Sequence, residues 1–240
     1  MAGHSKWANI KHKKGRADAK RGKVFSRVTK EIIQAVKAGG SDPKSNAKLK
    51  LAIQKAKAVN LPADNIERNI KKAVKDDSID YLEITYELYG HGGVGIIVDA
   101  MTDNKNRLAS DMRIATNKKG GTVATPGAVT FNFDRKGVLQ VNADQGDEDT
   151  LSMQFIEAGA EDFDKEDDLF IVITDAQDLY KVKENLESGG LTVQEASLEM
   201  IPKTWVECDK ESFEKNEALI AFLEESDDVD IIFHNMKEIE

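Results

Sequence analysis

The first thirty residues of this 240-residue chain concentrate side chains that can bind phosphate. They contain ten lysines and arginines and a single carboxylate, Asp18, and an aromatic residue, Trp7, lies among the cations. Ammonium and guanidinium groups neutralise phosphates, and an exposed indole ring can stack on an unpaired base. The combination predicts nucleic-acid binding. The residues expected to make the contacts are Lys6, Trp7, Lys11, His12, Lys13, Lys14, Arg16, Lys20, Arg21, Lys23 and Arg27.

The charge of the whole chain is divided unevenly along its length. Residues 1–80 carry 20 lysines and arginines against 8 carboxylates, whereas residues 81–240 carry 14 against 35, so the net charge is −9. Because salt screens charges beyond about 10 Å, a basic front end held clear of an acidic remainder still attracts a polyanion. The alternative is a basic tail that only aids solubility, and Trp7 within the cluster argues against it.

Residues that could support catalysis or bind a cofactor lack the arrangement they need. Residues 90–95 fit G-x-G-x-x-G, but the β-branched residues that follow predict a strand, where a dinucleotide site requires a helix. We therefore expect a hairpin turn with positive φ angles. The four histidines show no metal-binding spacing, and the acidic neighbours of Cys208 disfavour its thiolate. These patterns predict a protein that is not an enzyme and has no metal ion or cofactor.

The chain also lacks a run of about 18 to 20 apolar residues and begins without the apolar core of a secretory signal. We expect a cytoplasmic protein with no membrane partner.

Two further charged segments have more than one interpretation. Residues 144–168 contain eleven carboxylates and one lysine, typical of a solvated face. The alternatives are paired carboxylates for acid/base catalysis or a divalent ion, and a surface that mimics phosphate or repels nucleic acid and so orients the basic part toward it. An amphipathic helix expected at residues 104–119 holds further cations, which form either a second, weaker contact surface or an ordinary exposed face. These cations are Arg107, Arg113, Lys118 and Lys119.

Apolar residues at helical spacing predict three helices behind the basic front end. The first begins at Lys23 and ends at Gly39, the second begins at Pro43 with Asp42 as its cap, and the third begins at Pro62 and ends near Lys75. The side chains expected to face inward are Val24, Phe25, Val28, Ile32, Val36, Leu49, Ala52, Ile53, Ala56, Ile66, Ile70 and Val74.

Strands and helices alternate after residue 80, with a hairpin expected between residues 128–133 and 137–141. This alternation predicts the α+β class. A helix at 212–225 and a strand at 229–234 follow a self-contained unit, so the third domain is expected to be inserted into the second. The predicted division is a flexible basic arm at 1–22, a helical basic domain at 23–76, an α+β domain at 77–143 and 209–240, and an inserted acidic α+β domain at 144–208.

Several motifs resemble those of the YebC/PmpR family. They are residues 2–12 (AGHSKWANIKH), 18–23 (DAKRGK), 51–57 (LAIQKAK), 64–68 (DNIER), Tyr89-Gly90 with Gly92-Gly93-Val94, and 102–107 (TDNKNR), and the similarity extends over essentially the whole chain. The resemblance implies a helical bundle followed by two α+β domains, the third inserted into the second. It also implies a probable cytoplasmic transcriptional regulator that binds DNA, or a translation factor that acts on ribosomes at difficult messages.

Taken together, the sequence predicts a non-enzymatic nucleic-acid-binding regulator of gene expression. The alternative is a ribosome-associated translation factor that binds ribosomal or messenger RNA. Both use the same basic residues, so the residue types do not separate DNA from RNA.

Overall fold

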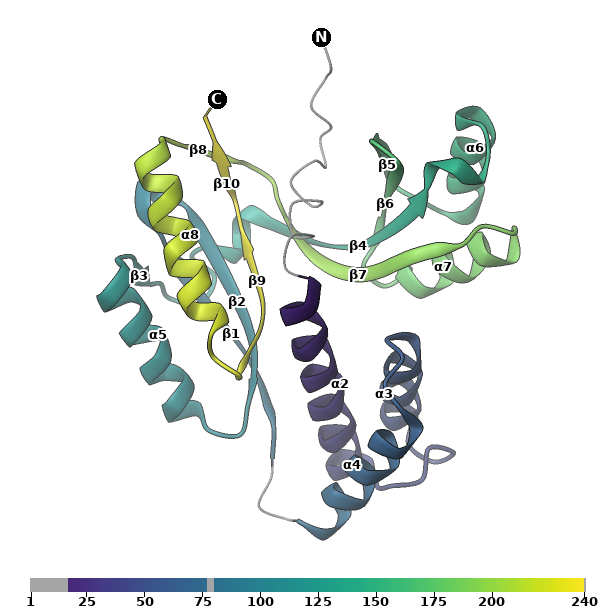
Figure 1. The fold of residues 1–240 in the computed structure, drawn as a ribbon, viewed down its shortest axis with the longest axis horizontal. Coiled ribbons are helices and arrows are strands. Elements are labelled where there is room, and N and C mark those ends of the chain that lie inside the picture. Colours follow the sequence, from purple (N-terminus) through teal and green to yellow (C-terminus); the bar gives the residue numbers. More distant parts are fainter. Residues whose placement is uncertain (1–16, 77–79, 240) are drawn as a thin grey trace. The chain divides into compact units, whose positions relative to one another are not determined.

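The computed structural model describes residues 17–76 and 80–239, and these residues form three helices followed by two four-stranded sheets with their own helices (Figure 1). Residues 17–131 and 205–239 make up one compact unit, and residues 132–204 make up another. The predicted α+β class and the N-terminal three-helix domain are confirmed.

The helical domain consists of α2 (Ala17–Gly39), α3 (Ala47–Ala58) and α4 (Ala63–Lys75). Its core includes Ile32, Ile33, Leu49 and Ile66, all buried. Helix α2 begins at Ala17, so it extends into the segment that the sequence analysis assigned to the flexible arm. The other predicted arm residues, 1–16, lie outside the described part of the chain.

The second helix begins four residues later than predicted, because Asn46 and not Asp42 caps it. The Asn46 Oδ1 atom accepts a hydrogen bond from the backbone N–H of Leu49 (3.0 Å), and its Nδ2 group donates to the carbonyls of Ala35 (2.7 Å) and Gly40 (2.8 Å). Residues 43–45 form a turn instead. The buried Asn46 therefore both starts α3 and ties it to the end of α2.

Two of the side chains predicted to face inward are exposed. Val24 is 40% exposed and Val74 is 58% exposed, and the buried residue in the last turns of α4 is Ala73.

The second domain contains an antiparallel sheet in the order β3-β1-β2-β9. The strands are β1 (Leu82–Tyr89), β2 (Gly95–Thr102), β3 (Thr122–Val123) and β9 (Val229–His234). Helices α5 (Lys105–Lys119) and α8 (Lys210–Glu224) lie side by side against one face of this sheet (Figure 1). Two short strands that were not predicted, β8 (Val206–Cys208) and β10 (Met236–Glu238), pair in parallel. Because β9 pairs with β2 after the excursion of residues 132–204, the predicted insertion is confirmed.

The glycine-rich segment forms the predicted turn between β1 and β2. Residues His91–Gly93 make a single 3-10 turn (η2), in which Gly92 and Gly93 have φ angles of 68° and 80°. The buried side chain of Asn216 accepts a hydrogen bond from the N–H of His91 (2.7 Å) and donates one to its carbonyl (3.0 Å). A strand follows the turn, so the helix N-terminus of a dinucleotide site is absent at this position.

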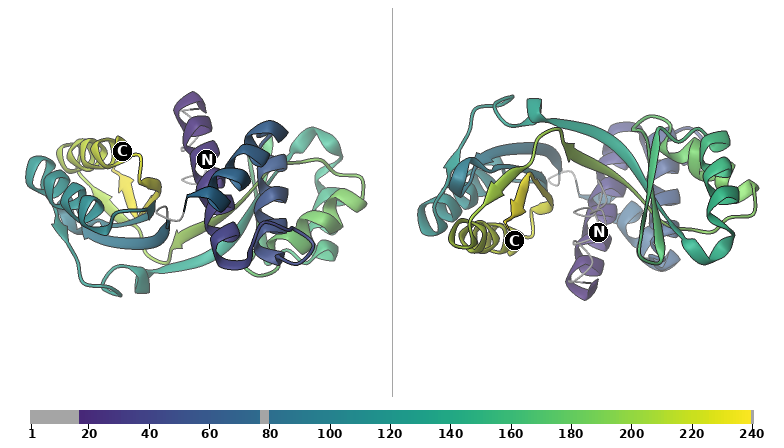
Figure 2. Two further views of the ribbon diagram at one scale, coloured as in Figure 1. Left: turned by 90° about the horizontal axis from the view of Figure 1, so that it is seen from below. Right: turned by 90° about the horizontal axis from the view of Figure 1, so that it is seen from above.

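The unit of residues 132–204 is a second antiparallel sheet in the order β5-β6-β4-β7. Its elements are β4 (Phe133–Asn142), α6 (Glu148–Ala158), β5 (Asp162–Glu166), β6 (Leu169–Asp175), α7 (Leu179–Ser188) and β7 (Val193–Pro202). The two helices cover one face of the sheet (Figure 2), and Leu139, Phe155, Phe170 and Val182 form the core between them. Short 3-10 turns lie at Thr130–Asn132 (η3) and Ala143–Gln145 (η4).

The predicted hairpin between residues 128–133 and 137–141 is wrong. Residues 134–136, whose polar sequence suggested a turn, continue strand β4 and pair with β7. Their charges are matched at the surface, because Lys136 binds Glu161 (2.6 Å) and Asp134 binds Lys203 (3.2 Å). Strand β4 belongs to the unit of residues 132–204, whereas the sequence-based division assigns it to the preceding domain.

Candidate nucleic-acid interface

The structure divides the predicted basic front end into three groups. Lys6, Trp7, Lys11, His12, Lys13, Lys14 and Arg16 lie outside the described residues. Lys20 and Arg21 belong to the first turns of α2, where the structure describes the helix but not their side chains. Lys23 and Arg27 are the predicted contacts whose side chains can be placed.

Both of these side chains make internal contacts. The Lys23 ammonium donates to the carbonyls of Ser226 (3.3 Å) and Val229 (3.0 Å) in the second domain, and burial lowers its pKa. Arg27 binds Glu31, one turn along the same helix, at 3.3 Å. The Lys23 ammonium is therefore occupied by the second domain, whereas the Arg27 side chain stays partly exposed beside Glu31.

Lys30, which the sequence analysis did not select, is buried more deeply on the same helix. Its ammonium donates to the carbonyls of Met101 (2.9 Å) and Asp227 (2.7 Å) and lies 3.9 Å from Asp230. A side chain that satisfies its charge on two carbonyls and a carboxylate fixes α2 against the second domain.

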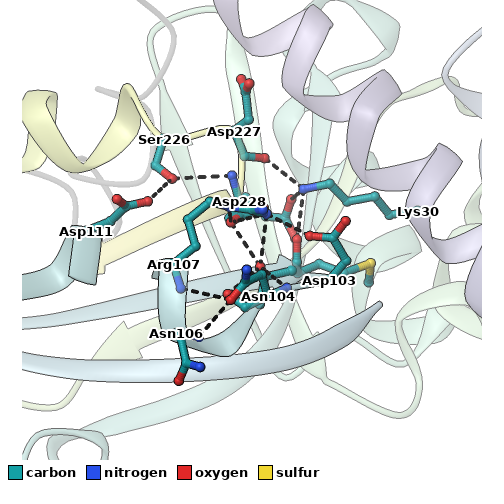
Figure 3. A network of polar contacts seen from close by, with 12 residues as sticks. Lys30, Asp103, Asn104, Asn106, Arg107, Asp111, Ser226, Asp227 and Asp228 are labelled. Atoms are coloured by element: carbon teal, nitrogen blue, oxygen red, sulfur yellow. Dashed lines mark hydrogen bonds and ion pairs between the residues drawn. The ribbon is translucent and has the colours of Figure 1, made fainter. Parts of the chain in front are cut away.

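The predicted secondary contact Arg107 belongs to a network of polar contacts at the start of α5 (Figure 3). Its guanidinium donates to both carboxylate oxygens of Asp228 (2.9 Å each) and to Asp103 (2.8 Å), and these hydrogen bonds raise its pKa. Thr102 also donates to Asp228, at 2.9 Å. Because two carboxylates match its charge, Arg107 holds the turn before β9 in place and offers little attraction to phosphate.

The other three predicted secondary contacts lie exposed on α5. The ammonium groups of Lys118 and Lys119 lie over the ring of Phe222, 5.4 and 5.8 Å from its centre. Arg113 is exposed two turns from the C-terminal end of the helix. Lys118 and Lys119 therefore lie together over Phe222, whereas Arg113 is exposed on another side of α5.

A larger set of exposed cations lies on α3 and α4, and the sequence analysis did not select it as a site. Residues 43–63 contain five lysines and no carboxylate. Lys55 binds Glu31 (2.9 Å), and the side chains of the other four are exposed, with no ion pair to a described residue. These four, called the α3 lysines below, are Lys44, Lys48, Lys50 and Lys57. The acid-free run was the signal in the sequence that could have found them.

Helix α4 presents a more mixed surface. Arg68, Lys71, Lys72 and Lys75 are exposed, but Arg68 donates to Asn65 (2.8 Å) and Lys71 lies 3.5 Å from Glu67. The positive surface of the helical domain is therefore strongest on α3.

The described residues contain no group of three or more His, Cys, Asp or Glu side chains placed to hold a metal ion. Cys208 is buried, and burial together with Asp209 raises the pKa of its thiol, which disfavours a nucleophilic thiolate. No helix within residues 17–76 or 80–239 has both the length and the apolar character to cross a bilayer.

Comparison with known proteins covers both parts of the chain. Residues 5–76 match the TACO1/YebC protein N-terminal domain, and residues 81–236 match the TACO1/YebC second and third domain. A protein of Protochlamydia amoebophila is 63% identical over 99% of this chain and 97% of its own length, and one of Chlamydia pneumoniae is 57% identical over 98% and 100%. Both are named probable transcriptional regulatory proteins.

A crystal structure of a conserved hypothetical protein from Aquifex aeolicus has the same fold. It superposes with a TM-score of 0.81 at 41% sequence identity and covers 98% of both chains. The fold, the two domain matches and the full-length similarity agree: the chain belongs to the TACO1/YebC family.

Proposed function

We propose that this protein is a non-enzymatic regulator of gene expression that binds nucleic acid in the cytoplasm. The basic segment of residues 1–16 and the α3 lysines form the contact surface, and DNA is the leading target. The names of the relatives support a regulatory role.

The observation that carries the proposal is the run of exposed lysines without a carboxylate in α3 and the turn before it. Four exposed ammonium groups lie on one helix and its preceding turn, and nothing negative in residues 43–63 offsets them. Such a surface attracts a phosphate backbone through counterion release, even when the whole protein is acidic.

RNA is the second candidate target, and the polar side chains of α4 are compatible with it. Asn65 accepts a hydrogen bond from Arg68, and Asn69 donates to the carbonyl of Asn65 (2.8 Å), so neither amide is set to read a base edge. Contacts to backbone phosphates without base readout suit ribosomal or messenger RNA as well as duplex DNA. Under this reading the protein is a ribosome-associated translation factor.

The test compares binding of a labelled 20-base-pair duplex and a 20-nucleotide polyuridylate RNA over a range of salt concentrations. Replacing Lys48, Lys50 and Lys57 with glutamine should weaken binding at least tenfold and flatten the salt dependence by about two to three units of slope. The matched control replaces three exposed lysines outside the helical domain, Lys105, Lys181 and Lys210, with glutamine.

Equal losses in the two triple variants would show that α3 is not the contact surface. Failure of the wild-type protein to bind either probe at low salt would overturn nucleic-acid binding itself. Co-sedimentation with ribosomes, together with weak duplex binding at the same salt concentration, would decide for the RNA target.

A further inference from the structure

Helix α2 carries a stripe of cations on the side opposite its apolar face. Intervals of three, four and three residues place the positions of Lys20, Lys23, Arg27 and Lys30 along one side of the helix. Ile32 and the other core residues face the opposite way, into the helical domain. These four positions are called the basic stripe below.

An acidic turn of the second domain covers two members of the basic stripe, Lys23 and Lys30. Residues 224–230 connect α8 to β9 and contain five carboxylates. Three carbonyls of this turn accept hydrogen bonds from Lys23 and Lys30, and the Asp230 carboxylate lies beside Lys30 (Figure 3 shows the Lys30 side). The turn presents negative oxygen atoms to the stripe, as a phosphate backbone does.

The acidic turn is held in place by its own domain. The Asp228 carboxylate is bound by Arg107 and Thr102, the hydroxyl of Ser226 donates to Asp111 (3.1 Å), and the Asp228 carbonyl accepts from the N–H of Met101 (2.9 Å). None of these contacts involves α2. The turn therefore keeps its shape when α2 moves away.

The contact between α2 and the turn is polar. The buried apolar residues of the helical domain and those of the second domain form two separate clusters. Separating the two surfaces exposes ammonium groups, carboxylates and carbonyls that water can solvate, so it does not require either core to unfold.

We propose that the acidic turn is an internal competitor that occupies Lys23 and Lys30 of the basic stripe, and that nucleic acid displaces it. Displacement releases Lys23 and Lys30 to phosphates, so the apparent affinity depends on the fraction of molecules in which the turn is undocked. This inference rests on the proposed function and adds α2 to its binding surface as a part whose exposure is regulated.

The environment of Asp230 supports a contact that can be displaced. Burial raises the pKa of Asp230 to about 6, against the attraction of Lys30, Arg27 and Lys23, and Glu31 raises it further. The ionised carboxylate therefore weakens docking at neutral pH, and a neutral side chain at this position strengthens it.

The test uses two substitutions at Asp230 that shift docking in opposite directions. Asp230→Asn removes the buried charge, so binding of the 20-base-pair duplex and of the 20-nucleotide polyuridylate RNA, measured in parallel at pH 7, should weaken about fivefold or more. Asp230→Lys repels the stripe, so binding should strengthen by a similar factor. Glu217→Gln and Glu217→Lys make the same charge changes at an exposed position of α8 and serve as controls. At pH 5 wild type and Asp230→Asn should bind alike.

If Asp230→Asn changes the affinity at pH 7 no more than Glu217→Gln does, the proposed competition is overturned and nucleic-acid binding is left intact. Absence of binding in every variant, including wild type, would instead overturn the proposed function. If Asp230→Lys does not fold, as judged by thermal unfolding, the comparison of Asp230→Asn at pH 7 and pH 5 decides alone.

Discussion

The ammonium nitrogen of Lys30 lies 3.9 Å from a carboxylate oxygen of Asp230, and the two side chains are only 9% and 5% exposed. The pair joins α2 to β9 across the boundary between the helical and second domains. Its attraction does not compensate for the loss of water around the carboxylate, because the pKa of Asp230 is raised to about 6. The pair therefore makes the stability of the protein depend on pH.

Asp230→Asn should stabilise the protein at pH 7 by up to about 3 kcal/mol, since a pKa raised by about two units corresponds to this much free energy. The raised pKa means that the folded state binds the proton more tightly than the unfolded chain does. The stability that protonated Asp230 contributes is therefore fully present below about pH 4, and it is lost as the pH rises through 6. Urea unfolding of both proteins from pH 4 to 8 measures the effect.

The difference between wild type and Asp230→Asn should thus shrink below pH 6 and disappear near pH 4. Glu217→Gln should show no such dependence, because Glu217 is exposed. A variant that is less stable than wild type at pH 7 would show that the attraction to Lys30 outweighs the burial of the carboxylate.

Arg107→Gln should destabilise the protein by about 2 kcal/mol, since it leaves the buried carboxylate of Asp228 without its guanidinium partner. This loss of unfolding free energy is smaller than the loss expected on breaking a fully buried ion pair, because the Arg107 side chain is 49% exposed. Thermal or urea unfolding measures it. In a double-mutant cycle, Asp228→Asn should recover part of the loss, and fully additive effects of the two substitutions would contradict a direct coupling.

Glu87→Gln should loosen the loop between β3 and β4. The buried Glu87 carboxylate accepts hydrogen bonds from the backbone N–H groups of Gly127 (2.6 Å), Val129 (2.5 Å) and Thr130 (2.8 Å). Burial raises its pKa, but these donors outweigh burial and the pKa is lowered. A neutral amide turns one acceptor into a donor, so a loss of about 2 kcal/mol in unfolding free energy is expected.

The contribution of Glu87 should be present above pH 4.5 and be lost as the pH falls through its lowered pKa. Amide hydrogen exchange of Gly127, Val129 and Thr130 in Glu87→Gln gives the local readout. Unchanged exchange at these three amides would show that the loop holds its shape without the carboxylate.

Most of the helices and longer strands could be predicted from the sequence because they depend on local patterns. Leu108, Met112 and Ala115 recur at helical spacing and are buried as that spacing implies. The partners of charged groups depend on tertiary structure. Lys20 and Lys23 look alike in the sequence, yet Lys23 donates to Ser226, 203 residues away. Nothing local to Lys23 indicates that partner.

The same limit applies to the cap of α3 and to strand β4. Asp42-Pro43 has the residue types of a helix start. Asn46 caps α3 instead, because its amide group also donates hydrogen bonds to the carbonyls of Ala35 and Gly40. Residues 134–136 resemble a turn, and pairing with β7 overrides that preference. The α3 lysines were visible as an acid-free run, and the helical spacing placed Lys48, Lys50 and Lys57 outside the apolar face.

Deleting residues 1–16 should separate binding from stability. The deletion removes five cations and no carboxylate, so the slope of log affinity against log salt should flatten by up to about 4.5 units for a duplex. The buried core of the helical domain begins at Val28, and α2 begins at Ala17, so the unfolding free energy should change by less than about 0.5 kcal/mol.

Deleting residues 1–22 provides the contrast, because it also removes the first six residues of α2 and brings the new end next to Lys23. This longer deletion should lower the melting temperature as well as the affinity, since fraying at Lys23 weakens its bonds to Ser226 and Val229. A fall of several degrees in the melting temperature of the shorter deletion would show that residues 1–16 pack against the folded domains. The loss of affinity in that deletion could then not be assigned to phosphate contacts alone.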